Sequence, residues 1–246
     1  MEGRQAVREL LLAGRRRVHE VLLAHDADGD AVEDIVELAR ERRTTVRRVP
    51  RAELESQARS EAPQGVLARA VPLGELGVDD VLAGIPSAGP TRAFLVALDG
   101  VTDPGNLGAV LRCCDGACVD AVLLPKHRAV HVSPTVAKAA AGAIEHVAIA
   151  LAPGLPSALE RLKAAGVWLV GLDDAAERSL FDLGALATDH VCLVLGAEGA
   201  GLSRLVRERC DVVASIPMLG QLSSLNVSAA AALACYEVAR ARLGTR

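Results

Sequence analysis

Hydrophobic positions in the first 70 residues alternate between helical and strand-like spacing. In some stretches the apolar residues recur every three or four positions, and in others they form short runs bounded by polar or turn-forming residues. This alternation predicts a small α/β unit. We expect helices at residues 4–13, 31–41 and 51–59, and strands at residues 18–23, 45–49 and 65–70.

Turn-forming residues then gather between positions 84 and 90. Gly84, Pro86, Ser87, Gly89 and Pro90 fall within seven residues, a density that the interior of a helix or strand does not tolerate. We therefore expect a linker at residues 84–92. It would separate a first domain, residues 1–83, from a second domain, residues 93–246.

Short apolar runs return in the second domain, each separated from the next by a helix-sized piece. They read "RAFLVALDG", "DAVLLP", "EHVAIAL", "GVWLVGLD" and "HVCLVLG". Strands that are apolar throughout and alternate with crossover helices are typical of a parallel sheet covered on both faces. The predicted fold class is therefore α/β, with an open parallel sheet in the second domain.

Composition and charge limit how such a protein could contact nucleic acid. Hydrophobic residues make up 51% of the 246 residues but aromatic residues only 2%, which argues against a module that stacks bases on aromatic rings. The net charge of -4 argues against binding RNA or DNA by overall charge. Arginines gather near the start of the chain, and both a solvated surface and a polyanion-binding face remain open for them. They are Arg15, Arg16, Arg17, Arg40, Arg42, Arg43, Arg47, Arg48 and Arg51.

The cysteines indicate neither a metal site nor a disulfide framework. The six residues lack the paired spacing of zinc ligands and are too sparse for a disulfide scaffold, so we expect reduced thiols in the core and no metal. The N-terminus lacks the apolar stretch of a signal peptide, and no apolar run is long enough for a membrane span. These features predict a cytoplasmic protein.

Ligands of parallel α/β sheets bind beyond the carboxyl ends of the strands, which directs attention to three loops. In the first, the strand at residues 93–98 runs into a turn at residues 103–106 that precedes a helix. Asn106 could cap that helix or present its amide to a ligand. Arg112 follows six residues later, so both side chains could reach one cleft, although a plain surface arginine is the default interpretation of Arg112.

The second and third loops add a glycine-rich turn and a polar helix start. Residues 196–201 read "GAEGAG", which fits neither the dinucleotide fingerprint nor the Walker A pattern, and Glu198 there argues against a bound phosphate. A plain tight turn is the alternative. In "QLSSLNVSAA", Ser224 and Asn226 flank Leu225 where a helix begins. Because one helix end needs only one such cap, the surplus polar groups indicate a binding site.

Together the three stretches resemble the motifs of the SpoU/TrmH branch of the SPOUT methyltransferases. The matching segments are "DPGNLGAVLR", "LVLGAEGAGL" and "SIPMLGQLSSLNVSAAAA", in that order. This family transfers a methyl group from S-adenosylmethionine to a ribose 2′-hydroxyl in RNA. Two N-terminal segments, "GRQAVRELL" and "PQGVLARAVPL", are similar to the family's small RNA-binding domain, which resembles a ribosomal protein.

The resemblance implies a fold, partners and an assignment of site residues. It implies a trefoil knot in the SPOUT domain and a homodimer whose active sites form across the subunit contact. Cofactor-binding residues would be Leu195, Gly196, Ile216, Met218 and Leu225, with no metal. Catalytic residues that meet the target nucleotide would be Asn106, Arg112, Glu198, Ser224 and Asn226.

The choice of RNA and the role of one arginine stay open within this resemblance. The chain is most similar to bacterial enzymes that methylate a guanosine in the peptidyl-transferase loop of 23S rRNA. A tRNA methylase, an antibiotic-resistance rRNA methylase and a non-catalytic ribosome assembly factor are the alternatives. Many members carry a basic residue where this chain has Gly105. Arg112 is the family's candidate proton acceptor, yet a guanidinium stays protonated in proteins, which favours a clamp on ribose and phosphate.

Overall fold

The computed structural model describes residues 1–60, 63–87, 91–127 and 129–244. The chain divides into two compact units. Unit 1 comprises Met1–Gly74 and His131–His146, and unit 2 comprises Glu75–Val130 and Val147–Arg246. Of the expected linker at 84–92, residues 88–90 lie outside the described residues, and the expected domain boundaries stay a prediction.

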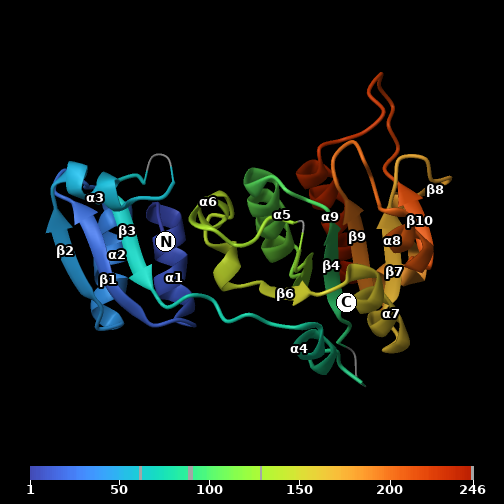
Figure 1. Cartoon of the computed structure of the whole chain (residues 1–246), viewed down its shortest axis with the longest axis horizontal. Helices are drawn as coiled ribbons and strands as arrows, with labels where there is room; N and C mark the ends of the chain where they lie inside the picture. The colour runs from blue at the N-terminus through green and yellow to red at the C-terminus, as the bar shows by residue number, and fades with distance from the viewer. Residues whose placement is uncertain (61–62, 88–90, 128, 245–246) are drawn as a thin grey trace. The chain divides into compact units, whose positions relative to one another are not determined.

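Unit 1 contains a three-stranded sheet with strand order β2-β1-β3 (Figure 1). The central strand β1 (Val18–Ala24) pairs in parallel with β2 (Thr45–Val49) and antiparallel with β3 (Val66–Ala70). The helices are α1 (Arg4–Ala13), α2 (Asp30–Glu41) and α3 (Arg51–Gln57). Leu10, Leu22, Ile35 and Leu54 are fully buried and join these elements in one core. The small α/β unit predicted from hydrophobic spacing is confirmed.

A later segment of the chain completes unit 1. Residues 131–146 form helix α6 (Pro134–Ala139) and the 3-10 helix η1 (Ala143–Glu145). The carboxylate of Glu145 is fully buried and forms an ion pair with Arg16. Arg15 donates from Nη1 to the carbonyl oxygens of Glu145, at 2.9 Å, and His146, at 3.2 Å. The sequence gives no sign of this association, because nothing in the pattern pairs residues 130 positions apart.

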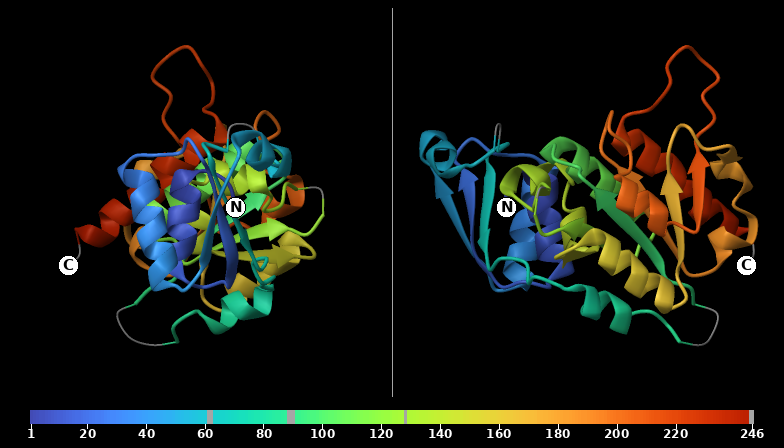
Figure 2. Two further views of the ribbon diagram at one scale, coloured as in Figure 1. Left: turned by 90° about the vertical axis from the view of Figure 1, so that its left-hand side faces the viewer. Right: turned by 45° about the vertical axis from the view of Figure 1, so that its right-hand side comes forward.

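Unit 2 is built on a seven-stranded sheet with strand order β6-β5-β4-β9-β7-β10-β8. Figure 1 labels most of these strands, and Figure 2 gives two further views of the sheet. All its strand pairs are parallel, which confirms the predicted parallel α/β sheet. Two short elements were not expected, helix α4 (Val78–Ala83) and strand β8 (Arg178–Ser179), since each is too short to show a periodic pattern. The strands are β4 (Phe94–Asp99), β5 (Ala121–Pro125), β6 (Ala148–Ala152), β7 (Trp168–Leu172), β8, β9 (Val191–Gly196) and β10 (Val212–Ser215).

Helices cover both faces of this sheet, as expected for strands that are apolar throughout. On one face α4, α7 (Leu155–Ala164) and α8 (Arg204–Arg209) bury alternate strand residues such as Leu95 and Val194. On the other, α5 (Pro104–Gly116) packs against α9 (Val227–Leu243), with the 3-10 helices η2 (Leu180–Asp182) and η3 (Gly184–Thr188) beside α9. Within the described ranges, no helix combines the length and apolar character needed to cross a membrane.

Candidate active site

Neighbouring strands of unit 2 bring the first two predicted loops together. In the β4–β9 pair, Asp99 at the end of β4 lies opposite Gly196 at the end of β9. The loops that follow these residues therefore leave the sheet at the same edge, the usual place for a ligand in such folds. Asp99 also accepts a hydrogen bond from the backbone N–H of Ser203 at 2.7 Å, which ties the second loop to the end of the first strand.

The third loop is joined to the other two by Asn226, the N-cap residue of α9. Its Oδ1 accepts from the backbone N–H of Ser228 at 2.8 Å and from the Ser228 hydroxyl at 2.7 Å. Capping thus fixes which way the amide faces, and its Nδ2 group points away from the helix. Nδ2 donates to Asn106 Oδ1 at 3.0 Å and to Glu198 Oε2 at 3.2 Å.

Asn106 is not the cap of its own helix. Asp103 is the N-cap of α5, and its carboxylate accepts from the backbone N–H of Asn106 at 2.7 Å. The half-buried amide of Asn106 is therefore free for the contact with Asn226. In the part of the chain that the structure describes, no hydrogen bond engages Asn106 Nδ2, so this donor is available to a ligand.

A pocket of about 360 Å³ lies beside this cluster of Asn106, Glu198 and Asn226. Pockets of this size hold small organic ligands. Glu198 belongs to both, because it lines the pocket and accepts from Asn226. The pocket is lined by all five predicted cofactor residues, Leu195, Gly196, Ile216, Met218 and Leu225, together with Glu198, Ser224 and ten further residues.

The pocket wall at the glycine-rich turn is made of backbone. A Cβ atom on Gly196 would lie 2.1 Å from the carbonyl carbon of Gly201, so no larger residue fits there. The turn closes with a hydrogen bond from the N–H of Gly201 to the oxygen of Ala197 at 2.9 Å, and both Gly199 and Gly201 have positive φ. Exposed main-chain groups next to apolar side chains suit a ligand held by its polar edges and its flat or aliphatic parts.

Arg112 is the one predicted residue that the structure does not bring into contact with the others. It is exposed on α5, does not line the pocket, and has neither a hydrogen bond nor an ion pair within the described ranges. Its guanidinium is therefore free to contact a phosphate or a ribose. Ser224 is also exposed, and it does not cap α9.

Two acidic residues at this site were not predicted from the sequence. Asp173 and Asp174 directly follow β7 and line the pocket. Asp173 is held by an ion pair with Arg207 and by the N–H of Ala175, which donates at 3.0 Å. The same rule that located the other loops, a polar residue after a buried strand, would have found both.

The cysteines lie apart from this chemistry. All six are free thiols, and Cys114, Cys192 and Cys235 are buried, whereas Cys118 is exposed. Burial raises the pKa of Cys210 to about 11 and raises the pKa of Cys192 further. Across the described residues, no three His, Cys, Asp or Glu side chains are grouped so as to hold a metal ion.

Comparisons with known proteins agree with this geometry. Residues 93–236 match the SpoU rRNA Methylase family, and residues 1–75 match the family described as RNA 2'-O ribose methyltransferase substrate binding. The 23S rRNA (guanosine-2'-O-)-methyltransferase RlmB of Xanthomonas campestris pv. campestris is 40% identical over 227 residues, covering 92% of this chain and 90% of that protein.

Solved structures of the same kind superpose on nearly the whole chain. The SpoU methyltransferase AviRb from Streptomyces viridochromogenes, in complex with AdoMet, matches with a TM-score of 0.79 and 27% identity, covering 99% of this chain and 90% of AviRb. A crystal structure of an RNA 2'-O ribose methyltransferase matches with a TM-score of 0.80 and 28% identity, covering 99% and 88%. The chain belongs to the SpoU family of RNA methyltransferases. The predicted family and enzyme class are thereby confirmed, and so is S-adenosylmethionine as the cofactor, which the AviRb complex contains.

Proposed function

We propose that this enzyme methylates the 2′-hydroxyl of a guanosine ribose in the peptidyl-transferase loop of 23S rRNA, with S-adenosylmethionine as donor. The observation that carries the proposal is the position of Glu198, which lines the pocket and also accepts from Asn226. A ligand in the pocket would thus lie next to a cluster with a free amide donor, suited to a sugar hydroxyl. The 40% identical Xanthomonas relative supports the choice of RNA.

The donor would be held by Leu195, Gly196, Ile216, Met218 and Leu225, all of which line the pocket. When bound, S-adenosylmethionine supplies a methyl group activated by its positively charged sulfur. The backbone wall at Gly196 and the apolar side chains around it would contact the uncharged parts of the donor, and the carboxylates of Asp173, Asp174 and Glu198 would attract its positive charge.

The polar residues would act on the acceptor ribose. Asn106, with its Nδ2 free, would donate to the ribose, while Asn226 holds that amide in place and Glu198 in turn accepts from Asn226. Ser224, at the pocket rim, would contact the nucleotide. Arg112 would clamp the ribose and an adjacent phosphate in fixed geometry, because its guanidinium forms paired hydrogen bonds and stays protonated. The proton that the 2′-hydroxyl loses would therefore pass to water or to the carboxylate of Glu198, which lines the pocket. Alignment of this kind accounts for much of the rate in displacement reactions.

Several finer features also belong to this proposal. We infer a trefoil knot in a methyltransferase domain at residues 93–246, and a ribosomal-protein-like RNA-binding domain at residues 1–83. The strand order supports the knot, because β9 lies between β4 and β7 although it follows both in the sequence. We also infer a homodimer in the cytoplasm. Exposed apolar side chains on α9, namely Leu233, Tyr236 and Leu243, support a protein interface there.

A map of 2′-O-methylated nucleotides distinguishes the proposed RNA substrate from the alternative ones. Purified enzyme and S-adenosylmethionine would be incubated with 23S rRNA and with bulk tRNA, and 2′-O-methylation would be mapped nucleotide by nucleotide. The proposal predicts one methylated guanosine in the peptidyl-transferase loop. Methylation of tRNA or of another rRNA nucleotide would support the alternatives, and no transfer together with no cofactor binding would support an assembly factor.

A further inference from the structure

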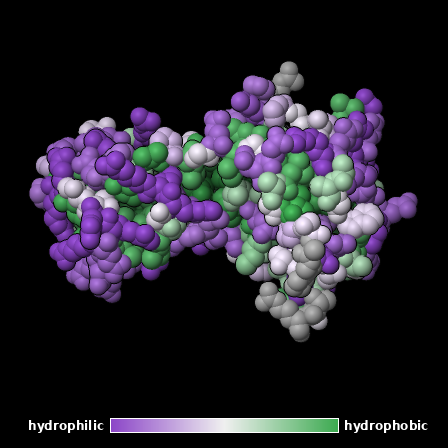
Figure 3. Space-filling view, turned by 90° about the horizontal axis from the view of Figure 1, so that it is seen from below, coloured by the Kyte–Doolittle hydropathy of each residue, from purple (hydrophilic) through white to green (hydrophobic). Residues whose placement is uncertain are grey.

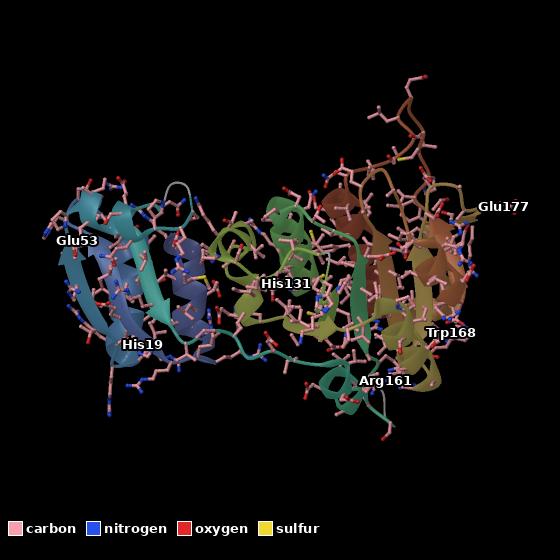
Figure 4. The ribbon with its side chains drawn as sticks, in the orientation of Figure 1. His19, Glu53, His131, Arg161, Trp168 and Glu177 are labelled. Carbon is pink, nitrogen blue, oxygen red and sulfur yellow. The ribbon has the colours of Figure 1, made fainter. Side chains whose placement is uncertain are left out.

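Unit 1 contains a cavity of about 450 Å³ at the end where α1 and α2 finish and β1 and β2 begin. Figure 3 looks toward this end of unit 1, where hydrophilic residues cover much of the surface. His19, near the start of β1, marks the same end in Figure 4. The lining residues are Leu10, Leu11, Gly14, Arg16, Arg17, Val18, His19, Arg42, Arg43, Thr44 and Thr45. We call this cavity the arginine pocket.

All the ionisable side chains that line the arginine pocket are basic. Its lining includes four arginines and a histidine, and no carboxylate is among the lining residues. Two of the arginines are held by the protein itself. Arg16 forms an ion pair with the buried Glu145. Arg42 donates from Nη2 to the carbonyl of Leu12 at 2.8 Å and lies directly over Gly14, where a Cβ atom would be 2.4 Å from Arg42 Nη1.

The other two arginines have no such role. Arg17 and Arg43 are exposed, and within the described residues neither side chain forms a hydrogen bond or an ion pair. Thr44 and Thr45 place two hydroxyl groups in the same lining. The pocket therefore offers two free guanidinium groups together with neutral hydrogen-bond donors, the combination that binds a phosphate group.

Helix ends do not account for these cations. The C-terminal ends of α1 and α2 carry partial negative charge and attract basic side chains. Arg42 serves that purpose, since it donates to a carbonyl of the last turn of α1. The side chains of Arg17 and Arg43 donate to no carbonyl in the described part of the chain, so their charge is left for a ligand.

Most arginines of the N-terminal cluster that lie outside the pocket differ from Arg17 and Arg43, with Arg40 as the exception. Arg47 pairs with Glu20, Arg51 pairs with Asp26, and Arg48 donates to backbone carbonyls such as that of Ala27 at 3.1 Å. Most of the arginine cluster seen in the sequence is thus used within the protein. Because the whole chain carries a net charge of -4, binding to a polyanion requires a local cationic site such as this one.

We propose that the arginine pocket binds backbone phosphates of the substrate RNA and so positions the RNA without reading its sequence. The inference rests on the proposed function, which makes RNA the substrate, and on the match of residues 1–75 to a substrate-binding family. Contacts of this kind set register and affinity, whereas contacts to bases set specificity. The ligand chemistry is a phosphodiester held by Arg17, Arg43 and the two threonine hydroxyls.

The test compares two double variants in the full-length protein. Arg17→Ala/Arg43→Ala removes both free cations of the pocket. Arg40→Ala/Arg59→Ala removes the same charge from exposed arginines outside its lining whose side chains form no hydrogen bond or ion pair among the described residues. RNA affinity would be measured by fluorescence anisotropy on a 23S rRNA fragment across a salt series. Binding of S-adenosylmethionine would be measured separately by calorimetry.

The proposal predicts that the pocket variant alone binds RNA about tenfold more weakly at moderate salt, with a log–log salt slope reduced by about 1.5 for two lost phosphate contacts. Cofactor affinity should be unchanged. Equal affinity and slope in wild type and pocket variant would overturn the proposal, as would equal losses in both double variants. Inorganic phosphate binding that requires Arg17 and Arg43, with unchanged RNA affinity, would assign the pocket to a free anion and also overturn it. Because anisotropy needs no methyl transfer, a failure of the proposed function would show separately, as absent methylation.

Discussion

The side-chain amide of Asn226 donates to Asn106 Oδ1 at 3.0 Å while its own oxygen caps helix α9. Asn226 therefore both caps a helix and holds a second residue of the site. Capping fixes the orientation of the amide, and the fixed amide joins the loops after β4 and β9 through Asn106 and Glu198. The polar start of α9 is thus a part of the site that also serves the helix.

Arg112→Lys should slow methyl transfer by about 100-fold in single-turnover experiments, because lysine keeps the charge but loses the planar pair of donors. The substitution should leave stability unchanged, since Arg112 is exposed and has no partner among the described residues. Rapid-quench measurement of transfer to RNA checks the rate. A rate within twofold of wild type would exclude the clamp.

Gly196→Ala should damage the cofactor pocket, because the added Cβ atom would lie 2.1 Å from backbone at Gly201. We expect a loss of ~1–3 kcal/mol in the free energy of unfolding and weaker cofactor binding. Gly220→Ala is the control, since a Cβ atom there meets nothing within 4 Å. Calorimetry on both variants measures the two quantities. If the two variants behave alike, the backbone wall at Gly196 is not needed.

Arg242→Lys should destabilise unit 2 by ~2 kcal/mol, because buried carbonyl groups lose their donors. Arg242 donates to the carbonyls of Ala187, Arg92, Ala93 and Asp189 at 2.8–3.1 Å and stacks over Phe94. The control on the same helix is Arg240→Lys. The exposed Arg240 pairs with the buried carboxylate of Glu237, and because lysine keeps the positive charge the change should cost less than about 1 kcal/mol. Urea unfolding measures the stability of both variants. Equal unfolding midpoints would contradict the stabilising role of Arg242.

Alkylation of the folded protein should reach Cys118 well before Cys210. Cys118 is exposed, whereas burial raises the pKa of Cys210 to about 11, so only about a thousandth of that thiol is ionised at pH 8. Labelling of Cys210 should therefore rise as pH increases toward 11. Mass spectrometry after timed iodoacetamide treatment follows each site, with urea-unfolded protein as the control. Rapid labelling of Cys210 in folded protein at pH 8 would show that the thiol is not buried.

Hydrophobic spacing predicted the two sheets because strands and helices leave local patterns. The strand from Phe94 to Asp99 and the one from Val191 to Gly196 are continuous apolar runs, and their pairing places two of the site loops at one edge. The insertion of residues 131–146 into unit 1 left no such pattern. It depends on the pair of Arg16 with Glu145, two charges far apart in the sequence whose partnership only the folded chain defines.

The sequence indicated side chains that the structure brings together, but not the role of each one in the local contacts. Residue types after each strand indicated Asn106, Glu198 and Asn226, yet which asparagine was a cap could not be read from them. The answer depends on Asp103, which caps α5 and so frees Asn106. The exposure of Arg112 was equally hidden, because helical spacing places it near the cleft without saying what it contacts.

The most direct test of this account is the single-turnover rate of Asn226→Ser. Serine is also a good N-cap, so helix α9 and the melting temperature should be preserved, but the donor to Asn106 and Glu198 is lost. If the Asn226 amide holds the site together, methyl transfer to 23S rRNA should be about 100-fold slower than in wild type, with unchanged binding of S-adenosylmethionine. A variant that folds normally and transfers methyl groups at the wild-type rate would contradict it.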